Sequence, residues 1–205
     1  MEGWHTFTWK KSRALALAAL LLVSLGTTAT AAVVKPASGG GGEPFKNGDL
    51  FISGVVGLGL AGAYGTSSTP SIGVEVEKAI APEWSVGGVV GYSSSEQKYN
   101  YYYGEYGWKY TYVLVAARGG YHFVKFIKSP KLDAYAGLTL GYNHVTVKDV
   151  GNGLYSNYFT YKASGSYVLY GAHVGGRYFF NPNLAAQLEL GYGIGYLSAG
   201  LCWKF

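Results

Sequence analysis

Cysteine is almost absent from this sequence, since Cys202 is the single cysteine among 205 residues. The chain therefore has no internal disulfide and no metal site built on cysteine ligands. Charged residues are also scarce, at 13% against the roughly 25% of ordinary globular proteins. A disordered chain would be highly charged and poor in aromatic residues, whereas 17% of this sequence is aromatic. The composition indicates a structured chain with little water on much of its surface.

No apolar run of ordinary transmembrane-helix length is evident either. The run Ala14–Leu25 is shorter than the about 20 residues that a membrane-spanning helix needs. It follows Lys10, Lys11 and Arg13 and precedes a small-residue site that ends at Ala31, which is the pattern of a secretory signal peptide. We expect cleavage after Ala31, and no lipoprotein anchor, because no cysteine lies near that site.

The chain divides into three parts on this basis. Residues 1–31 are the cleaved signal peptide, residues 32–47 form a flexible periplasmic leader that contains SGGGGEP, and residues 48–205 form the folded domain. Loss of the signal peptide lowers the formal charge from +5 to +3, because that segment contains three basic residues and one acidic residue. The remaining charge is scattered, so nucleic-acid binding is not expected.

Apolar and polar residues alternate through most of the chain after the leader, and no window has helical periodicity. In the last nine residues, LSAGLCWKF, Leu197, Leu201 and Phe205 share one face while Ser198 and Lys204 share the other. This period of two is typical of a strand whose two faces meet different environments. Eight such segments are expected, at about residues 49–64, 71–80, 83–98, 106–124, 132–147, 164–180, 184–193 and 197–205.

The connections between these segments differ in length. Tight turns contain Pro82, Pro130 and Pro182. Short turns at one end and long loops at the other are typical of a transmembrane β-barrel, whose tilted strands need about 9–11 residues each. We predict an all-β fold, an eight-stranded antiparallel up-and-down transmembrane β-barrel, with ten strands as the alternative if a loop contains a hairpin. The loops, rich in Tyr, Gly and Ser, are expected around residues 65–70, 94–107 and 148–163, with a short one near 193–195.

Aromatic residues recur near both ends of the apolar faces. This distribution predicts the two aromatic belts that lie at the interfaces of a bilayer. Toward the long loops the belt would contain Tyr64, Tyr92, Tyr142 and Tyr192. At the short-turn end it would contain Trp84, Tyr121, Phe123, Tyr178, Phe180, Trp203 and Phe205.

A signal peptide, eight such strands and the terminal sequence Trp203-Lys204-Phe205 resemble the OmpA/OmpX-type small outer-membrane barrels of Gram-negative bacteria. The resemblance covers residues 47–205. It implies secretion to the periplasm, location in the cell outer membrane, a monomer, and contact with outer-membrane lipid and lipopolysaccharide. In that family the terminal Phe strand is read by the barrel-assembly machinery, a role that would fall to Phe205. The resemblance implies fold and compartment more specifically than function.

The polar faces of the expected strands carry charges that would point into the barrel. An eight-stranded barrel is just wide enough for side chains to fill it, and an unpaired buried charge is costly. We therefore expect the charges to pair and plug the lumen, with Glu189 diagonally beside Arg177. A proton or ion path is the alternative. The residues are Glu75, Glu77, Arg118, His122, Asp133, His173, Arg177, Gln187, Glu189 and Lys204.

Tyrosine is concentrated in two of the expected loops, in YNYYYGEYGWKYTY at 99–112 and LYSNYFTYK at 154–162. Tyr offers large amphipathic contact area at low entropic cost, so these segments are a candidate extracellular surface for a partner, a glycan or a host molecule. The alternative is that long strands protrude from the bilayer and pack their tyrosines across strands. The surface residues are Tyr101, Tyr102, Tyr103, Tyr106, Trp108, Tyr155, Tyr158 and Phe159.

An enzyme is not expected, and neither is a cofactor or a metal. The outer-membrane lipid A deacylases use a His-x-Ser pair with a Glu, whereas the nearest stretch here is His144-Val145-Thr146. His122 and His173 have no obvious serine nucleophile beside them, although Ser-His-acid triads do assemble across strands. The predicted function is non-enzymatic, in membrane integrity or cell-surface adhesion through the Tyr-rich loops. A narrow channel or hydrophobic small-molecule carrier is the first alternative, and a lipid-modifying barrel enzyme is the second.

Overall fold

The structure is a computed structural model that describes residues 43–58, 67–101, 104–150 and 162–205. Contacts divide the chain into residues 1–36 and 37–205, and every described residue belongs to the second unit. Within this described part, no helix has the length and hydropathy to cross a membrane. The strands are β1 (Leu50–Leu58), β2 (Ser67–Ser68), β3 (Ser71–Ala81), β4 (Trp84–Tyr101), β5 (Gly104–His122), β6 (Leu132–Asp149), β7 (Lys162–Asn181), β8 (Leu184–Gly191) and β9 (Leu197–Lys204).

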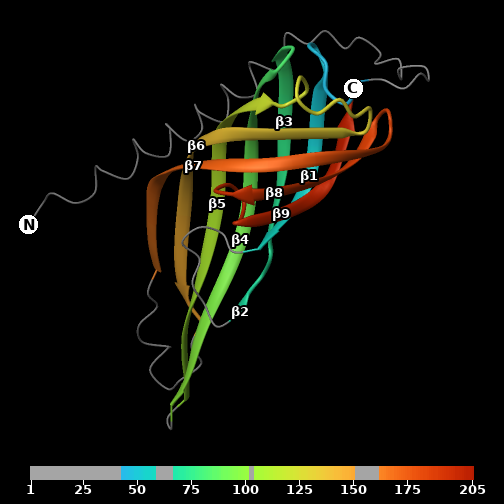
Figure 1. Cartoon of the computed structure of the whole chain (residues 1–205). Helices are drawn as coiled ribbons and strands as arrows, with labels where there is room; N and C mark the ends of the chain where they lie inside the picture. The colour runs from blue at the N-terminus through green and yellow to red at the C-terminus, as the bar shows by residue number, and fades with distance from the viewer. Residues whose placement is uncertain (1–42, 59–66, 102–103, 151–161) are drawn as a thin grey trace, which may run out of the picture. The chain divides into compact units, whose positions relative to one another are not determined.

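Eight of these strands close into a ring (Figure 1). The order around the ring is β1, β3, β4, β5, β6, β7, β8 and β9, and each strand pairs antiparallel with the next. The last strand, β9, pairs with β1, where Ile52 lies opposite Trp203. The backbones of Leu50 and Phe205 complete this seam with reciprocal hydrogen bonds of 3.1 and 2.8 Å. The two residues of β2 only extend the wall beside β4. The predicted eight-stranded antiparallel up-and-down barrel is confirmed.

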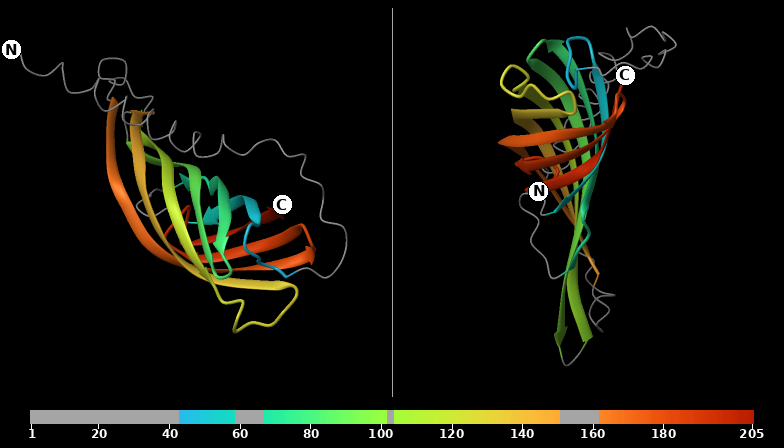
Figure 2. Two further views of the ribbon diagram at one scale, coloured as in Figure 1. Left: turned by 90° about the horizontal axis from the view of Figure 1, so that it is seen from above. Right: turned by 45° about the vertical axis from the view of Figure 1, so that its right-hand side comes forward.

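The hairpin of β4 and β5 is longer than the sequence pattern suggested. The two strands pair without interruption from Trp84–Tyr121 to Tyr101–Gly104. The expectation of a loop around residues 94–107 is therefore wrong, because cross-strand pairs such as Tyr99 opposite Tyr106 continue the ladder. Figures 1 and 2 show this hairpin extending well beyond the other strands, at the end opposite the C-terminus.

Burial alternates along each strand and separates an outer face from an inner face. On β3, Val74 is 52% exposed while the adjacent Glu75 is 5% exposed. The outer face carries a wide apolar surface, which soluble monomers rarely expose. Its aromatic residues lie near the two ends of the wall. At the short-turn end, the side chains that are about half exposed are those of Trp84, Tyr178, Phe180, Trp203 and Phe205, while Tyr121 and Phe123 are partly buried. Toward the opposite end, Tyr92, Tyr142 and Tyr192 are exposed. Tyr64 lies outside the described residues.

The lumen is filled with side chains in layers. Charged residues lie between an apolar cluster at the short-turn end and a second apolar cluster farther along the barrel. The second cluster includes Ile194, which enters from the β8–β9 connection. A Cβ atom at Gly73 would lie 2.2 Å from Ile194 Cδ1, so a glycine is needed there. The first cluster is Phe45, Phe51, Ala79, Phe179, Ala185 and Cys202, and the second is Val55, Val89, Leu114, Ala116, Leu169 and Ile194.

Residues 43–47, which the sequence pattern assigned to a flexible leader, pack into the short-turn mouth of the barrel. Phe45 is 2% exposed and stacks on His122, with 3.7 Å between ring centroids. Lys204 Nζ donates to the Glu43 carbonyl oxygen at 2.7 Å and lies 3.0 Å from an oxygen of Asp49. A single inserted aromatic residue produces no periodic pattern, so the sequence could not distinguish this segment from the leader.

Candidate functional site

The charged residues predicted to face the lumen lie inside the barrel, where they form two clusters. In the cluster nearer the short-turn mouth, Arg177 on β7 is 1% exposed. Its Nη2 donates to Glu77 Oε2 at 2.6 Å, and its Nη1 donates to Glu77 Oε1 at 3.1 Å and to Asp133 Oδ2 at 3.3 Å. Its guanidinium carbon lies 4.6 and 4.7 Å from the ring centres of Phe51 and Tyr135. The cation is thus bonded at its edge and stacked on its faces.

The second cluster surrounds Arg118 on β5. Its Nη2 donates to both carboxylate oxygens of Glu189, at 2.8 and 2.9 Å, and its Nη1 pairs with Glu75. The Tyr135 hydroxyl donates to Glu189 Oε1 at 2.7 Å. One arginine therefore pairs with two carboxylates here, with a phenol as an additional donor.

Gln187 on β8 connects the two clusters. Its Oε1 accepts hydrogen bonds from Arg177 Nε at 3.2 Å and from Ser53 Oγ at 2.8 Å. Its Nε2 donates to Glu75 at 2.7 Å and to Glu189 at 3.2 Å. The amide supplies an acceptor to one cluster and donors to the other, so the network is continuous across the lumen.

The expected proximity of Glu189 to Arg177 does not result in an ion pair in the structure. Arg177 instead pairs with Glu77 on β3, and Glu189 pairs with Arg118 on β5. These strands are not neighbours in the ring. Long side chains therefore reach across the lumen to partners that no strand-to-strand register predicts.

The remaining predicted lumen residues lie at different depths. His173 on β7 is buried, and its Nδ1 lies 3.2 Å from Thr139 Oγ1. Lys204 lies at the short-turn mouth, next to Glu43 and Asp49. Within the described ranges, no group of three or more His, Cys, Asp or Glu side chains is arranged to hold a metal ion.

A buried hydrogen-bond chain connects a serine, a histidine and an aspartate. Ser85 Oγ lies 3.0 Å from His122 Nε2, and His122 Nδ1 lies 2.7 Å from Asp133 Oδ1. The expectation that no serine lies beside His122 is therefore wrong. The two residues are 37 positions apart and meet because β4 and β5 pair, so local sequence carried no sign of the contact.

The surroundings of this chain differ from those of a working catalytic triad, in which the histidine accepts the serine proton. His122 Nε2 also lies 3.2 Å from Glu77 Oε1. Both ring nitrogens thus have a carboxylate acceptor, and a nitrogen that donates a hydrogen bond cannot accept a proton from Ser85. Phe45 covers the ring from the mouth side. The arrangement acts as a buried polar support between strands.

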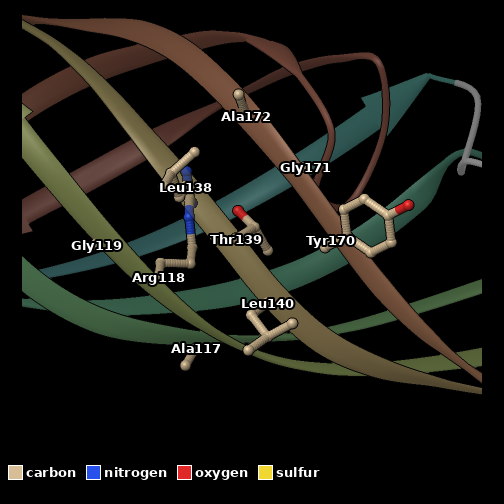
Figure 3. Close-up of a pocket in the computed structure, with 9 residues that line it drawn as sticks. All are labelled: Ala117, Arg118, Gly119, Leu138, Thr139, Leu140, Tyr170, Gly171 and Ala172. Carbon is tan, nitrogen blue, oxygen red and sulfur yellow. The ribbon is translucent and has the colours of Figure 1, made fainter.

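A groove of about 510 Å³ lies on the outer wall (Figure 3). Small residues on β5 and β7, among them Ala117 and Ala172, border the larger Leu138, Leu140 and Tyr170. Arg118 is also among the residues at this groove, but its guanidinium is bonded inside the lumen. The groove therefore opens to the surroundings of the barrel and is no entrance to the charged clusters.

The structure places only part of the predicted aromatic surface. Trp108 lies on β5 and is half-buried. Tyr101 and Tyr106 belong to the long hairpin by their backbone. Tyr102, Tyr103, Tyr155, Tyr158 and Phe159 lie outside the described residues.

No protein-family model and no curated protein sequence matches this chain. Among solved structures, it is similar to the N-terminal β-barrel domain of Pseudomonas aeruginosa OprF, with 14% identity, 78% of this chain and 100% of that chain covered, and a TM-score of 0.47. It is also similar to Ail, the attachment invasion locus protein of Yersinia pestis, in complex with the heparin analogue sucrose octasulfate. The identity is 14%, 78% of this chain and 99% of that chain are covered, and the TM-score is 0.48. For the outer membrane protein OprG from Pseudomonas aeruginosa, the identity is 15%, 80% of this chain and 98% of that chain are covered, and the TM-score is 0.42.

Similarity at this level does not extend to ligand or activity. The pairing of the strands itself establishes the closed eight-stranded ring. This pairing confirms the fold that the resemblance implied, an eight-stranded antiparallel barrel.

Proposed function

We propose that this chain is a non-enzymatic outer-membrane β-barrel with a closed lumen, which contributes to membrane integrity and to contacts at the cell surface. The observation that carries this proposal is the outer wall, where an apolar band lies between two sets of aromatic residues. Along β4, Trp84 and Tyr92 mark the two edges, with Val86 and Val90 exposed between them. At about 3.4 Å per residue and a tilt of about 40°, these edges are roughly 20 Å apart, close to the about 25 Å of a barrel's apolar band.

The contents of the lumen support a closed barrel over a channel or a carrier. The apolar cluster around Leu114 and Ile194 crosses the barrel on one side of the charges. The cluster around Phe45 and Phe179 crosses it on the other side. The charges between them are hydrogen-bonded to one another. An ion would have to displace packed side chains, so we expect no single-channel conductance from this chain in planar bilayers.

The long hairpin is the part that we assign to surface contacts. Its tip lies well beyond the level of Tyr92, and its strands keep pairing as far as Tyr101. A paired hairpin presents its tyrosines on a rigid support, which lowers the entropic cost of binding a host or cell-surface ligand. Deletion of residues 96–109 is expected to abolish binding to such a ligand while the barrel still folds.

The proposed partners follow from the same placement. The apolar band would contact outer-membrane lipid and lipopolysaccharide. Phe205 directly follows β9, with its ring half exposed on the outer face, which suits reading by the barrel-assembly machinery before the β1–β9 seam closes.

A serine hydrolase is the second candidate, favoured by the single observation of the Ser85–His122–Asp133 chain. An active-site fluorophosphonate probe distinguishes the two candidates. The closed-barrel proposal predicts no labelling of the detergent-folded protein beyond the level of the Ser85→Ala variant. Labelling that Ser85→Ala abolishes would favour the hydrolase.

The test of the main proposal is the electrophoretic mobility of the outer-membrane fraction, with and without heating. A closed barrel resists detergent until it is boiled, so the unheated protein should migrate separately from the heated protein. A single band in both lanes, or recovery of the protein in the soluble periplasmic fraction, would contradict the proposal.

A further inference from the structure

The connection between β5 and β6, residues 123–131, is the most basic turn at the short-turn end. Its sequence FVKFIKSPK contains three lysines and no acidic residue. The backbone makes one tight turn, in which the amides of Phe126 and Ile127 both donate to the Phe123 carbonyl oxygen, at 3.0 and 2.9 Å. This turn presents Phe126 outward with 75% of its surface exposed, between Lys125 and Lys128. An exposed aromatic ring beside two lysines suits the interface of a bilayer, where an aromatic ring and a cation both find partners at the level of the headgroups.

A cleft of about 720 Å³ lies between this connection and residues 43–47. Lys46, Lys125 and Lys128 line it, together with Glu43 and Glu83. Lys125 is paired with Glu83, and this carboxylate raises the pKa of the Lys125 ammonium above the ordinary value of a lysine. The ammonium groups of Lys46 and Lys128 take part in no ion pair within the described part of the chain, and the same is true of Lys131.

The ring contacts place this connection at the level of the membrane interface. Phe123 packs edge-on against Tyr121, at 5.4 Å between ring centroids, and Tyr121 packs edge-on against Trp84 at 5.1 Å. These residues belong to the aromatic set at the short-turn end, where interfacial belts lie level with lipid headgroups. Phe126 continues the series, 6.5 Å from Phe123.

We propose that the cleft binds the phosphate headgroup of an anionic phospholipid in the periplasmic leaflet, with Phe126 inserted beside the acyl chains. Lys46 and Lys128, which line the cleft, complement the phosphate charge as mobile point charges. Lys131 lies outside the cleft, at the end of the same connection, and adds positive charge beside it. Phe126 favours a lipid over free phosphate or an acidic soluble protein, because its exposed ring gains from contact with acyl chains. The proposal rests on the proposed membrane location, since a soluble chain would have no leaflet at this level.

The test uses the mature chain folded in detergent, with heat-modifiable mobility checked first. The folded protein is mixed with phosphatidylglycerol, with phosphatidylcholine of the same chain length, or with inorganic phosphate, and native mass spectrometry measures what stays bound. Each lysine close to an anionic lipid surface strengthens binding by about fivefold. The triple variant Lys46→Gln/Lys128→Gln/Lys131→Gln should therefore bind phosphatidylglycerol about 100-fold more weakly.

A matched control removes three exposed lysines near the opposite end, Lys109→Gln/Lys148→Gln/Lys162→Gln, and should keep the wild-type preference. The variant Phe126→Ser should lose lipid binding while phosphate binding is unchanged. Equal retention of the two lipids, or equal losses in the two triple variants, would overturn the headgroup site. If wild type and Phe126→Ser both bind inorganic phosphate and neither binds lipid detectably, the assignment of a lipid as the ligand would be overturned. A chain without heat-modifiable mobility would instead contradict the proposed membrane function itself.

Discussion

Replacement of Arg177 by methionine is the most direct test of how the lumen is held together. Arg177 is the cation that pairs with both Glu77 and Asp133, and it is almost completely buried. Methionine keeps much of the length and volume of the side chain but removes its charge and its hydrogen bonds. The two carboxylates would remain in the lumen with only His122 beside them.

The expected cost is about 3–5 kcal/mol of unfolding free energy, because the loss of one partner from a buried ion pair leaves an uncompensated charge. This corresponds to a decrease of about two to nearly four orders of magnitude in the folding equilibrium constant. The penalty belongs mainly to Glu77, which loses two hydrogen bonds from Arg177, whereas Asp133 loses one and keeps its 2.7 Å contact with His122. The double variant Arg177→Met/Glu77→Gln should therefore recover more than half of the loss.

Urea unfolding of the mature chain in phospholipid vesicles measures these differences, with the folded fraction followed on unheated gels. Lys162→Met on the same strand is the control, since an exposed substitution should stay within about 0.5 kcal/mol of wild type. An Arg177→Met variant within about 1 kcal/mol of wild type would refute the argument. It would mean that water or another group stabilises the two carboxylates when Arg177 is absent.

Three further predictions concern the mouth and the packing of the lumen. Phe45→Ala should cost about 3–5 kcal/mol and lower the temperature at which the folded gel band disappears; an unchanged temperature would mean that Phe45 does not plug the mouth. Because Glu83 raises the pKa of Lys125, their interaction should weaken on the alkaline side as the pH rises through that raised value, and Glu83→Gln should lower the pKa measured by NMR at the lysine side chain; an identical pKa in this variant would contradict the pairing. Gly73→Ala should cost about 1–3 kcal/mol by overpacking, and urea unfolding should show a smaller cost of Gly73→Ala in an Ile194→Ala background than in wild type; additive losses would argue against the clash.

Local pattern was sufficient to predict the wall of the barrel. A period of two is enough to predict that Val74 points outward and Glu75 inward, since alternation is set within the strand itself. The short proline-containing segments at Pro82, Pro130 and Pro182 predict the tight turns between alternating stretches. The prediction failed where composition resembled a loop, as between Ser94 and Gly107, because tyrosine and serine suit both a loop and a paired hairpin.

The alternation of apolar and polar residues predicts most of the strands, their apolar faces and the charges that lie inside the ring. The closed barrel decides which ion pairs form across the lumen, because its closure and tilt bring β3 opposite β7 and allow Arg177 to reach Glu77. It also decided that Ser85 lies against His122 and that Phe45 enters the mouth. Such contacts depend on distances across the barrel, and those distances exist only after the ring has closed.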